Sequence, residues 1–147
     1  MTNDAKTKCG FVALVGAPNA GKSTLLNRLV GSKVAIVTPK AQTTRHLLRG
    51  IQTIEDTQLI YMDTPGIFNA EETYEKAMVS HAWNGARDAD VVLLLIDTVR
   101  GLHDGIRAII QGLKNQEKPI ALILNKVDKI NKEKLLLLTA ELNSLHE

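Results

Sequence analysis

A glycine-rich segment near the N-terminus has the residue types and the spacing of a phosphate-binding loop. Residues 16–23 read GAPNAGKS and match the pattern G-x-x-x-x-G-K-[ST] in full. Glycines let the backbone turn tightly, so that successive N–H groups and the start of the next helix can face phosphate oxygens. Lys22 can reach the outer phosphates, and the hydroxyl of Ser23 can bind Mg²⁺. A glycine-rich turn is the simpler explanation, but the complete pattern between an apolar strand and a helix favours a nucleotide site.

A second motif, Asp63-Thr64-Pro65-Gly66, directly follows the apolar segment 58–62. The pattern D-x-x-G is common, and Asp, Pro and Gly also suit an ordinary turn. Its position argues for more than a turn, because a carboxylate at the end of a buried strand beside the phosphate-binding loop can hold Mg²⁺ through a water molecule. The amide of Gly66 could then contact a γ-phosphate.

A third motif, Asn125-Lys126-Val127-Asp128, follows the apolar segment 119–124 and could also be a polar connection. A carboxylate such as Asp128 can accept from both the N1–H and the 2-amino group of guanine, whereas adenine offers neither donor. A bidentate contact of this kind discriminates between bases by about 1–3 kcal/mol. Asn125 can serve the other edge of the purine or tie this segment to the phosphate-binding loop, and the stem of Lys126 can lie over the ring. The motif therefore favours GTP over ATP.

The residues of the first two motifs, Thr24 directly after the first motif, and three residues of the third motif define the expected nucleotide site. Its residues are Gly16, Ala17, Pro18, Asn19, Ala20, Gly21, Lys22, Ser23, Thr24, Asp63, Thr64, Pro65, Gly66, Asn125, Lys126 and Asp128.

The elements that must position these residues alternate between strand and helix. Apolar runs predict strands at 11–15, 48–54, 58–62, 90–96 and 119–124, and helical periodicity predicts helices at 22–30, 71–87, 103–114 and 131–145. Such alternation indicates an α/β fold with a mostly parallel sheet and helices on both of its faces. The hairpin 48–62 would add one antiparallel edge strand. All three motifs follow predicted strands, where the ligand crevice of such a sheet lies.

The composition is that of one globular domain. The chain has 147 residues, of which 44% are hydrophobic and 23% charged, values that exclude intrinsic disorder. The longest apolar run, 91–96, is far too short to span a membrane, and the single cysteine fits a reducing compartment. We therefore expect a cytoplasmic protein. The net charge of +2 does not by itself indicate a nucleic-acid partner.

In their order and spacing, GAPNAGKS, DTPG and NKVD resemble the motifs of the translation-factor-type GTPases. Segment 40–46, KAQTTRH, resembles the Era family in particular, because sister families have a G-T-T-R-D-like segment there. The resemblance runs from Phe11 onward. It implies a P-loop GTPase fold and a molecular switch that binds GTP or GDP with Mg²⁺ and hydrolyses GTP. It further implies a role in small ribosomal subunit assembly.

The resemblance also implies roles for single residues. Thr44, or alternatively Thr43, would bind Mg²⁺ when GTP is bound. Segments 39–47 and 63–74 would be switch loops that the γ-phosphate and Mg²⁺ order and that hydrolysis releases. The implied Mg²⁺ ligands are Ser23, Thr44 and Asp63, and the implied catalytic residues are Lys22, Thr44 and Gly66.

The same resemblance suggests how the chain is divided. Residues 1–10 would be an N-terminal tail and residues 11–147 the GTPase domain. Era-like proteins continue with a further guanine-contacting loop and a KH domain that binds small-subunit rRNA, so we expect a GTPase domain that is incomplete at its C-terminus. The expected partners are a guanine nucleotide and, for the full-length protein, small-subunit rRNA and the ribosome. A monomer is expected, and peripheral membrane association is left open.

Two positions leave alternatives open. Ile67 stands where Ras-like GTPases carry the glutamine that orients the attacking water, so a non-catalytic, nucleotide-gated binding module competes with the enzyme. Asn19 resembles the asparagine of related GTPases that use a bound K⁺, where carbonyls of residues 38–43 would complete the site. The alternative is that Asn19 only serves a tight turn by tolerating a positive φ.

Overall fold

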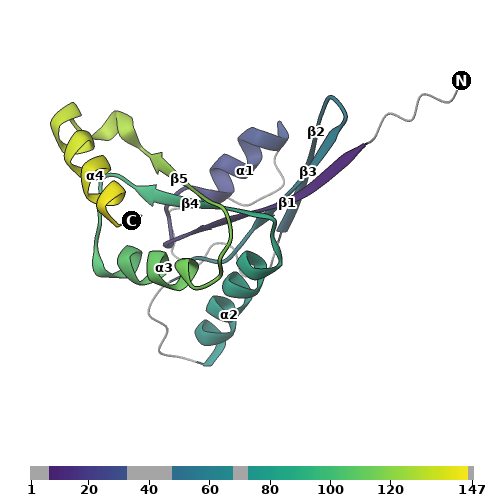
Figure 1. Ribbon diagram of the computed structural model, residues 1–147, viewed down its shortest axis with the longest axis horizontal. Coiled ribbons are helices and arrows are strands. Elements are labelled where there is room, and N and C mark those ends of the chain that lie inside the picture. Colours follow the sequence, from purple (N-terminus) through teal and green to yellow (C-terminus); the bar gives the residue numbers. More distant parts are fainter. Residues whose placement is uncertain (1–6, 33–47, 68–72, 146–147) are drawn as a thin grey trace, which may run out of the picture.

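The middle layer of the molecule is a β-sheet whose strands follow the predicted segments. Within residues 7–32, 48–67 and 73–145, which the computed structural model describes, five strands form one sheet in the order β2-β3-β1-β4-β5 (Figure 1). The strands are β1 (Lys8–Gly16), β2 (Leu48–Ile54), β3 (Thr57–Asp63), β4 (Val91–Asp97) and β5 (Ile120–Asn125). The helices are α1 (Lys22–Val30), α2 (Thr73–Asp88), α3 (Asp104–Lys114) and α4 (Lys132–Ser144), with a 3₁₀ turn η1 (Val127–Lys129) after β5.

The pairing of the strands confirms the predicted fold class. β1 runs parallel to β3 and β4, and β4 runs parallel to β5, whereas β2 pairs with β3 antiparallel at the edge of the sheet. The β2–β3 hairpin closes through Glu55 and Asp56, since Ile54 is paired with Thr57. Glu55 has a φ of 53°, which matches the positive φ that tight hairpin turns require.

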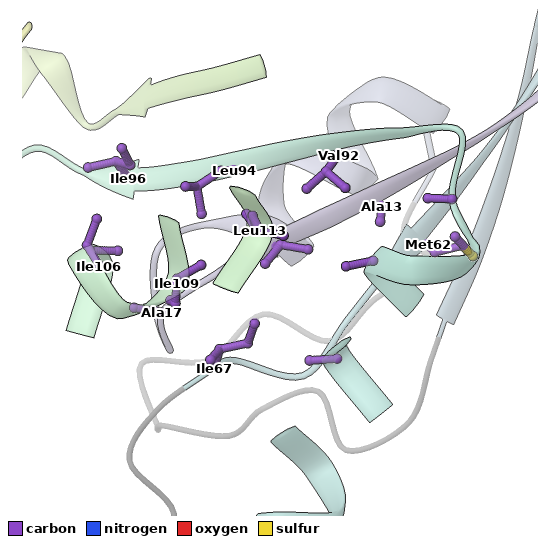
Figure 2. Packing of buried hydrophobic residues seen from close by; sticks show 14 of the residues in the cluster. Ala13, Ala17, Met62, Ile67, Val92, Leu94, Ile96, Ile106, Ile109 and Leu113 are labelled. Carbon is purple, nitrogen blue, oxygen red and sulfur yellow. The ribbon is translucent and has the colours of Figure 1, made fainter. Parts of the chain in front are cut away.

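Helices cover both faces of the sheet, and side-chain alternation along the strands fills both interfaces. Val12 and Leu14 of β1 pack in one cluster with Leu26 of α1. Ala13 and Val15 point to the opposite face. That second face forms the larger core with buried side chains from three helices. They are Ala82 and Ala86 of α2, Ile106, Ile109 and Leu113 of α3, and Leu138 and Leu142 of α4. Figure 2 shows the three residues of α3.

Most boundaries fall within one or two residues of the prediction, and β1 is the main difference. This strand begins at Lys8 rather than Phe11, because the parallel partner strand β3 continues alongside it and pairs Lys8 with Thr57. Helix α1 begins and ends as predicted, and Gly31 terminates it in the left-handed conformation at φ 77°. Among the described residues, no helix is both long and apolar enough to cross a membrane.

Candidate nucleotide-binding site

The parallel strands bring the three sequence motifs together on the side of the sheet where these strands have their carboxyl ends. β1 ends at Gly16, where the phosphate-binding loop starts, and β3 ends at Asp63. β5 ends at Asn125, so the third motif lies at the same edge. Since parallel strands have their carboxyl ends at one edge, segments about a hundred residues apart in sequence can meet there.

Lys22 is held against the backbone of the phosphate-binding loop. It is only 6% exposed, and its Nζ donates to the carbonyl oxygens of Gly16, at 3.2 Å, and of Ala17, at 2.9 Å. Burial lowers the pKa of Lys22 from 10.5 to about 8, although the negative charge of Asp63 opposes this shift. The ammonium group is therefore fixed at the loop where phosphate oxygens are expected.

Ser23 and Asp63 form an oxygen-rich pair beside Lys22. The hydroxyl of Ser23 donates to Asp63 Oδ2 at 2.6 Å, and Asp63 is fully buried. Such hard oxygen donors suit Mg²⁺, which usually takes one or two carboxylates and keeps several waters. Within the described part of the chain, no three His, Cys, Asp or Glu residues cluster as metal ligands, so the donors for Mg²⁺ found there are this pair of oxygens.

The D-T-P-G segment packs directly on the phosphate-binding loop. The hydroxyl of Thr64 donates to the carbonyl of Leu14 at 2.7 Å, and the N–H of Ile67 donates to the carbonyl of Gly16 at 3.0 Å. A Cβ at Gly66 would lie 2.8 Å from the backbone of Pro18, so only glycine fits this approach. Ile67 is buried in the larger core, at 7% exposure, which suits its apolar side chain.

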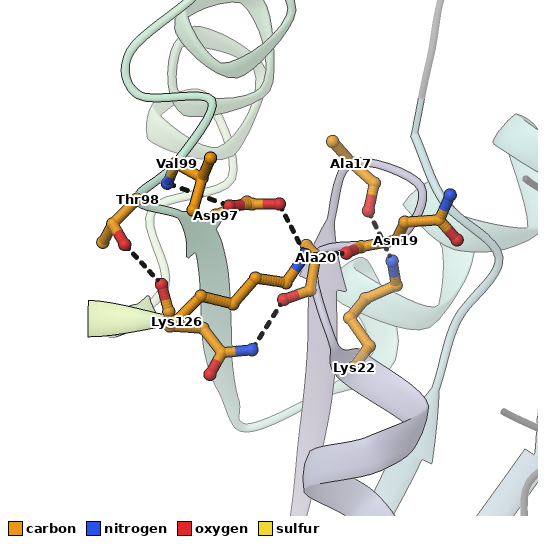
Figure 3. A network of polar contacts seen from close by, with 9 residues as sticks. Ala17, Asn19, Ala20, Lys22, Asp97, Thr98, Val99 and Lys126 are labelled. Carbon is orange, nitrogen blue, oxygen red and sulfur yellow. Dashed lines mark hydrogen bonds and ion pairs between the residues drawn. The ribbon is translucent and has the colours of Figure 1, made fainter. Parts of the chain in front are cut away.

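The Asn-Lys pair of the third motif also reaches the phosphate-binding loop. Asn125 Nδ2 donates to the carbonyl of Ala20 at 2.8 Å, and Lys126 Nζ donates to that of Asn19 at 2.8 Å (Figure 3). Of the two roles expected for Asn125, the structure therefore shows the contact with the phosphate-binding loop. A Cβ at Gly21, whose φ is 103°, would lie 2.2 Å from Asn125 Nδ2, so a side chain there would separate the two segments.

Asp128 and Thr24 lie at the outer side of the site. Asp128 is exposed in η1, where a base could reach its carboxylate, and Thr24 is exposed in the first turn of α1. Asn19 has a φ of 61°, which is the positive backbone angle expected if this residue serves a tight turn. Residues 38–47, which include Thr43 and Thr44, and residues 68–72 of the second switch segment lie outside the described residues.

Asp97, the last residue of β4, and Thr98 after it also join the site, although neither belongs to the three sequence motifs. Asp97 Oδ2 accepts from Lys126 Nζ at 2.6 Å, and Thr98 donates to the carbonyl of Asn125 from its N–H, at 3.1 Å, and its hydroxyl, at 2.8 Å. Burial raises the pKa of Asp97, but hydrogen bonds from Lys126 and Val99 outweigh it and keep this pKa below 3.8. The signal was present in the sequence, because Asp97 ends the most apolar strand just as Asp63 ends β3.

Residues 11–126 match a protein family described as 50S ribosome-binding GTPase. The chain belongs to this GTPase family. GTPase Era of Mesorhizobium japonicum is 57% identical over 137 residues, which cover 93% of this chain and 44% of that protein. GTPase Era of Rhizobium meliloti is 53% identical and is likewise covered over 44% of its length. The chain thus spans a little under half the length of these curated relatives.

Solved structures support the same assignment. A crystal structure of Era in complex with MgGDPNP and nucleotides 1506–1542 of 16S ribosomal RNA is 41% identical. Its TM-score is 0.90, over 95% of this chain and 48% of that one. NFeoB from S. thermophilus, bound to GDP·AlF4⁻ and K⁺, is 25% identical with a TM-score of 0.65, over 82% of this chain and 45% of that one. These similarities confirm the resemblance to the Era family and the predicted fold.

Proposed function

We propose that this chain is the nucleotide-binding domain of a GTPase switch that binds GTP with Mg²⁺ and hydrolyses it to GDP and phosphate. The observation that carries this proposal is the junction of the phosphate-binding loop with the Asn-Lys-x-Asp segment, through Asn125 to Ala20 and Lys126 to Asn19. A base held by the second segment would thereby keep a fixed position relative to phosphates held by the first.

Each residue of the site has a distinct task in this proposal. Lys22 offsets negative charge on the outer phosphates, and the backbone N–H groups around Gly21 bind their oxygens. Asp128 accepts from the guanine edge and so rejects adenine. Ser23, Thr44 and, through water, Asp63 hold Mg²⁺, which supplies positive charge to the phosphates. Gly66 contacts the γ-phosphate through its amide, and Lys22, Thr44 and Gly66 are the catalytic residues.

Single-turnover hydrolysis, with the protein in excess over GTP and Mg²⁺ present, tests this function. We expect release of phosphate from GTP and little binding of ATP in competition. Lys22→Ala should weaken GTP binding by roughly tenfold to hundredfold, because it removes a charge-assisted contact. Lys114→Ala changes an exposed lysine of α3 and serves as the matched control. Tight GTP binding without any phosphate release would instead favour the nucleotide-gated binding module that Ile67 leaves possible.

We further propose that Asn19 helps to hold a K⁺ ion that assists hydrolysis, together with carbonyls of residues 38–43. The support is the K⁺ bound to the related NFeoB and the position of Asn19 in the phosphate-binding loop. An added cation would stabilise transition-state charge, by less than the roughly 10³–10⁵-fold of an arginine finger. GTP turnover is compared in KCl and NaCl at equal ionic strength. Equal rates of the wild-type protein in the two salts contradict the proposal. K⁺ stimulation that persists in Asn19→Ala would show that Asn19 is not the ligand of K⁺.

For the longer protein we propose a cytoplasmic role in small ribosomal subunit assembly, in which the nucleotide state controls rRNA binding. The support is the Era complex with MgGDPNP and 16S rRNA, together with family membership. The test is affinity of the full-length protein for that rRNA segment with GDPNP and with GDP. Equal affinities in both states would contradict nucleotide control.

A further inference from the structure

We propose that Asp97 is a positioning residue for the base, which sets the orientation of the guanine-binding segment through Lys126. The inference rests on the proposed function and adds to it a specificity-determining residue outside the three sequence motifs. It begins from the polar network in Figure 3, in which the end of β4 lies between the phosphate-binding loop and the end of β5.

Both oxygens of the Asp97 carboxylate are engaged. Oδ2 accepts from Lys126 Nζ at 2.6 Å, and Oδ1 accepts from the N–H of Val99 at 3.0 Å. Asp97 is 8% exposed, so little solvent competes for these contacts. The bond to Val99 fixes the rotamer of the carboxylate, and the carboxylate in turn fixes the ammonium group of Lys126.

Lys126 transmits this restraint to the segment that carries Asp128. Its Nζ also donates to the carbonyl of Asn19 at 2.8 Å, so the ammonium group connects β4 with the phosphate-binding loop. Its backbone has a φ of 61°, a left-handed conformation that a residue with a side chain adopts only when its surroundings enforce it. The carbonyl of Lys126 accepts from the N–H of Lys129 at 3.0 Å and thereby closes the turn that contains Asp128.

Thr98, directly after β4, holds Asn125, the residue before Lys126. Its N–H and hydroxyl both donate to the carbonyl of Asn125, at 3.1 and 2.8 Å. The end of β4 therefore restrains two successive residues, one by its backbone and one by its side chain. The ammonium group of Lys126 contacts Asp97 and the carbonyl of Asn19. Without Asp97 it would keep only the second of these two contacts, and the backbone of Lys126 would be freer to leave the left-handed conformation.

A variant at Asp97 should therefore change the recognition of the base more than that of the phosphates. The test measures affinities for GDP, for inosine diphosphate, which lacks the 2-amino group, and for pyrophosphate. For Asp97→Asn we expect GDP affinity to fall roughly tenfold to hundredfold, the range for loss of a hydrogen bond to a charged group. The preference for GDP over inosine diphosphate should shrink, and pyrophosphate affinity should stay within about twofold. Asp88→Asn, at the exposed end of α2, is the matched control and should behave as wild type.

A double-mutant cycle with Lys126→Met tests whether Asp97 acts through Lys126. We expect Asp97→Asn to have no further effect on GDP affinity once Lys126 is replaced. If Asp97→Asn does not fold, Asp97→Glu, which keeps the charge and shifts the carboxylate by one methylene, takes its place in the cycle. Additive effects, or an equal loss of GDP and pyrophosphate affinity, would overturn the inference. Failure of the wild-type protein to bind GDP would instead refute the proposed function, whereas normal binding by both Asp97 variants refutes the inference alone.

Discussion

Among the residues that the structure describes, Lys22 has the ionisation that the folded environment changes most. In an unfolded chain its pKa is 10.5, and in the folded protein burial lowers this pKa to about 8. Between these two pH values the unfolded chain binds more protons at this residue than the folded protein does. The free energy of unfolding therefore contains a contribution from Lys22 that increases as the pH rises from about 8 to 10.5.

We expect this contribution to be visible in the absence of nucleotide. The free energy of unfolding of wild type, minus that of Lys22→Met, should increase by up to about 3 kcal/mol across that range, because each unit of pKa shift corresponds to about 1.4 kcal/mol. Urea unfolding at several pH values, with EDTA present, measures the difference. A difference that is flat or that falls with pH would contradict the burial of the charged group.

Asp128 gives the second prediction at the level of the residue. Asp128→Asn replaces an acceptor pair by one acceptor and one donor at the base and leaves the phosphate-binding loop unchanged. We expect GTP affinity to fall by about 1–3 kcal/mol and xanthosine triphosphate affinity to rise, since xanthine offers an acceptor where guanine has the 2-amino group. Competition of the two nucleotides against a fluorescent analogue measures this, and unchanged discrimination would show that Asp128 does not contact the base.

At the level of elements, the contact between α2 and α3 connects the core to the helix that follows the D-T-P-G segment. A Cβ at Gly112 of α3 would lie 2.5 Å from the indole ring of Trp83 on α2. The absence of a side chain at Gly112 therefore lets the two helices approach. Because the chain contains one tryptophan, its fluorescence reports the surroundings of Trp83, which include this contact.

We expect Gly112→Ala to shift the emission of Trp83 and to lower the free energy of unfolding by about 0.5–2 kcal/mol. Overpacking costs about 1–3 kcal/mol, and the higher helix propensity of alanine returns up to about 1 kcal/mol. Gly105→Ala in the same helix is the control, since its Cβ would meet only the ring of His103, at 3.0 Å, which is half-buried and can move. A Gly112→Ala protein with wild-type emission and equal or greater stability would rule out the close contact.

At the level of the whole molecule, the site joins segments that follow β1, β3, β4 and β5. A nucleotide that contacts the phosphate-binding loop and the guanine-binding segment together would hold these four strand ends in place. Unfolding separates them, so binding should stabilise the entire domain rather than one loop.

We expect GDP at a hundredfold excess over its dissociation constant, with Mg²⁺, to raise the free energy of unfolding by about 2.7 kcal/mol. Adding EDTA should reduce this gain because it removes the Mg²⁺ expected at Ser23 and Asp63. Thermal unfolding followed by circular dichroism, with ADP at the same concentration as the control, measures the effect. Equal stabilisation by ADP would contradict guanine selectivity.

The sequence by itself determined the fold class and the residues of the three motifs. Strand and helix periodicity are local properties, and a phosphate-binding loop is a contiguous run of backbone whose glycines can be recognised without a structure. Gly16, Gly21 and Lys22 therefore lie in the strand-to-helix turn between β1 and α1 that their pattern predicted. The hairpin of β2 and β3 was predictable for the same reason, since its turn residues lie between two apolar runs.

Only the tertiary structure decided how the segments are joined. Asp97 and Lys126 are 29 positions apart, and their contact depends on the register that places Asp97 opposite Asn125 in the β4–β5 pair. The extension of β1 to Lys8 likewise depends on the length of its neighbour β3. Register between distant strands is set by the packing of α2, α3 and α4 on the sheet, a sum of many weak contacts that no single segment encodes. For this reason the motifs revealed what could bind, and the fold revealed Asp97.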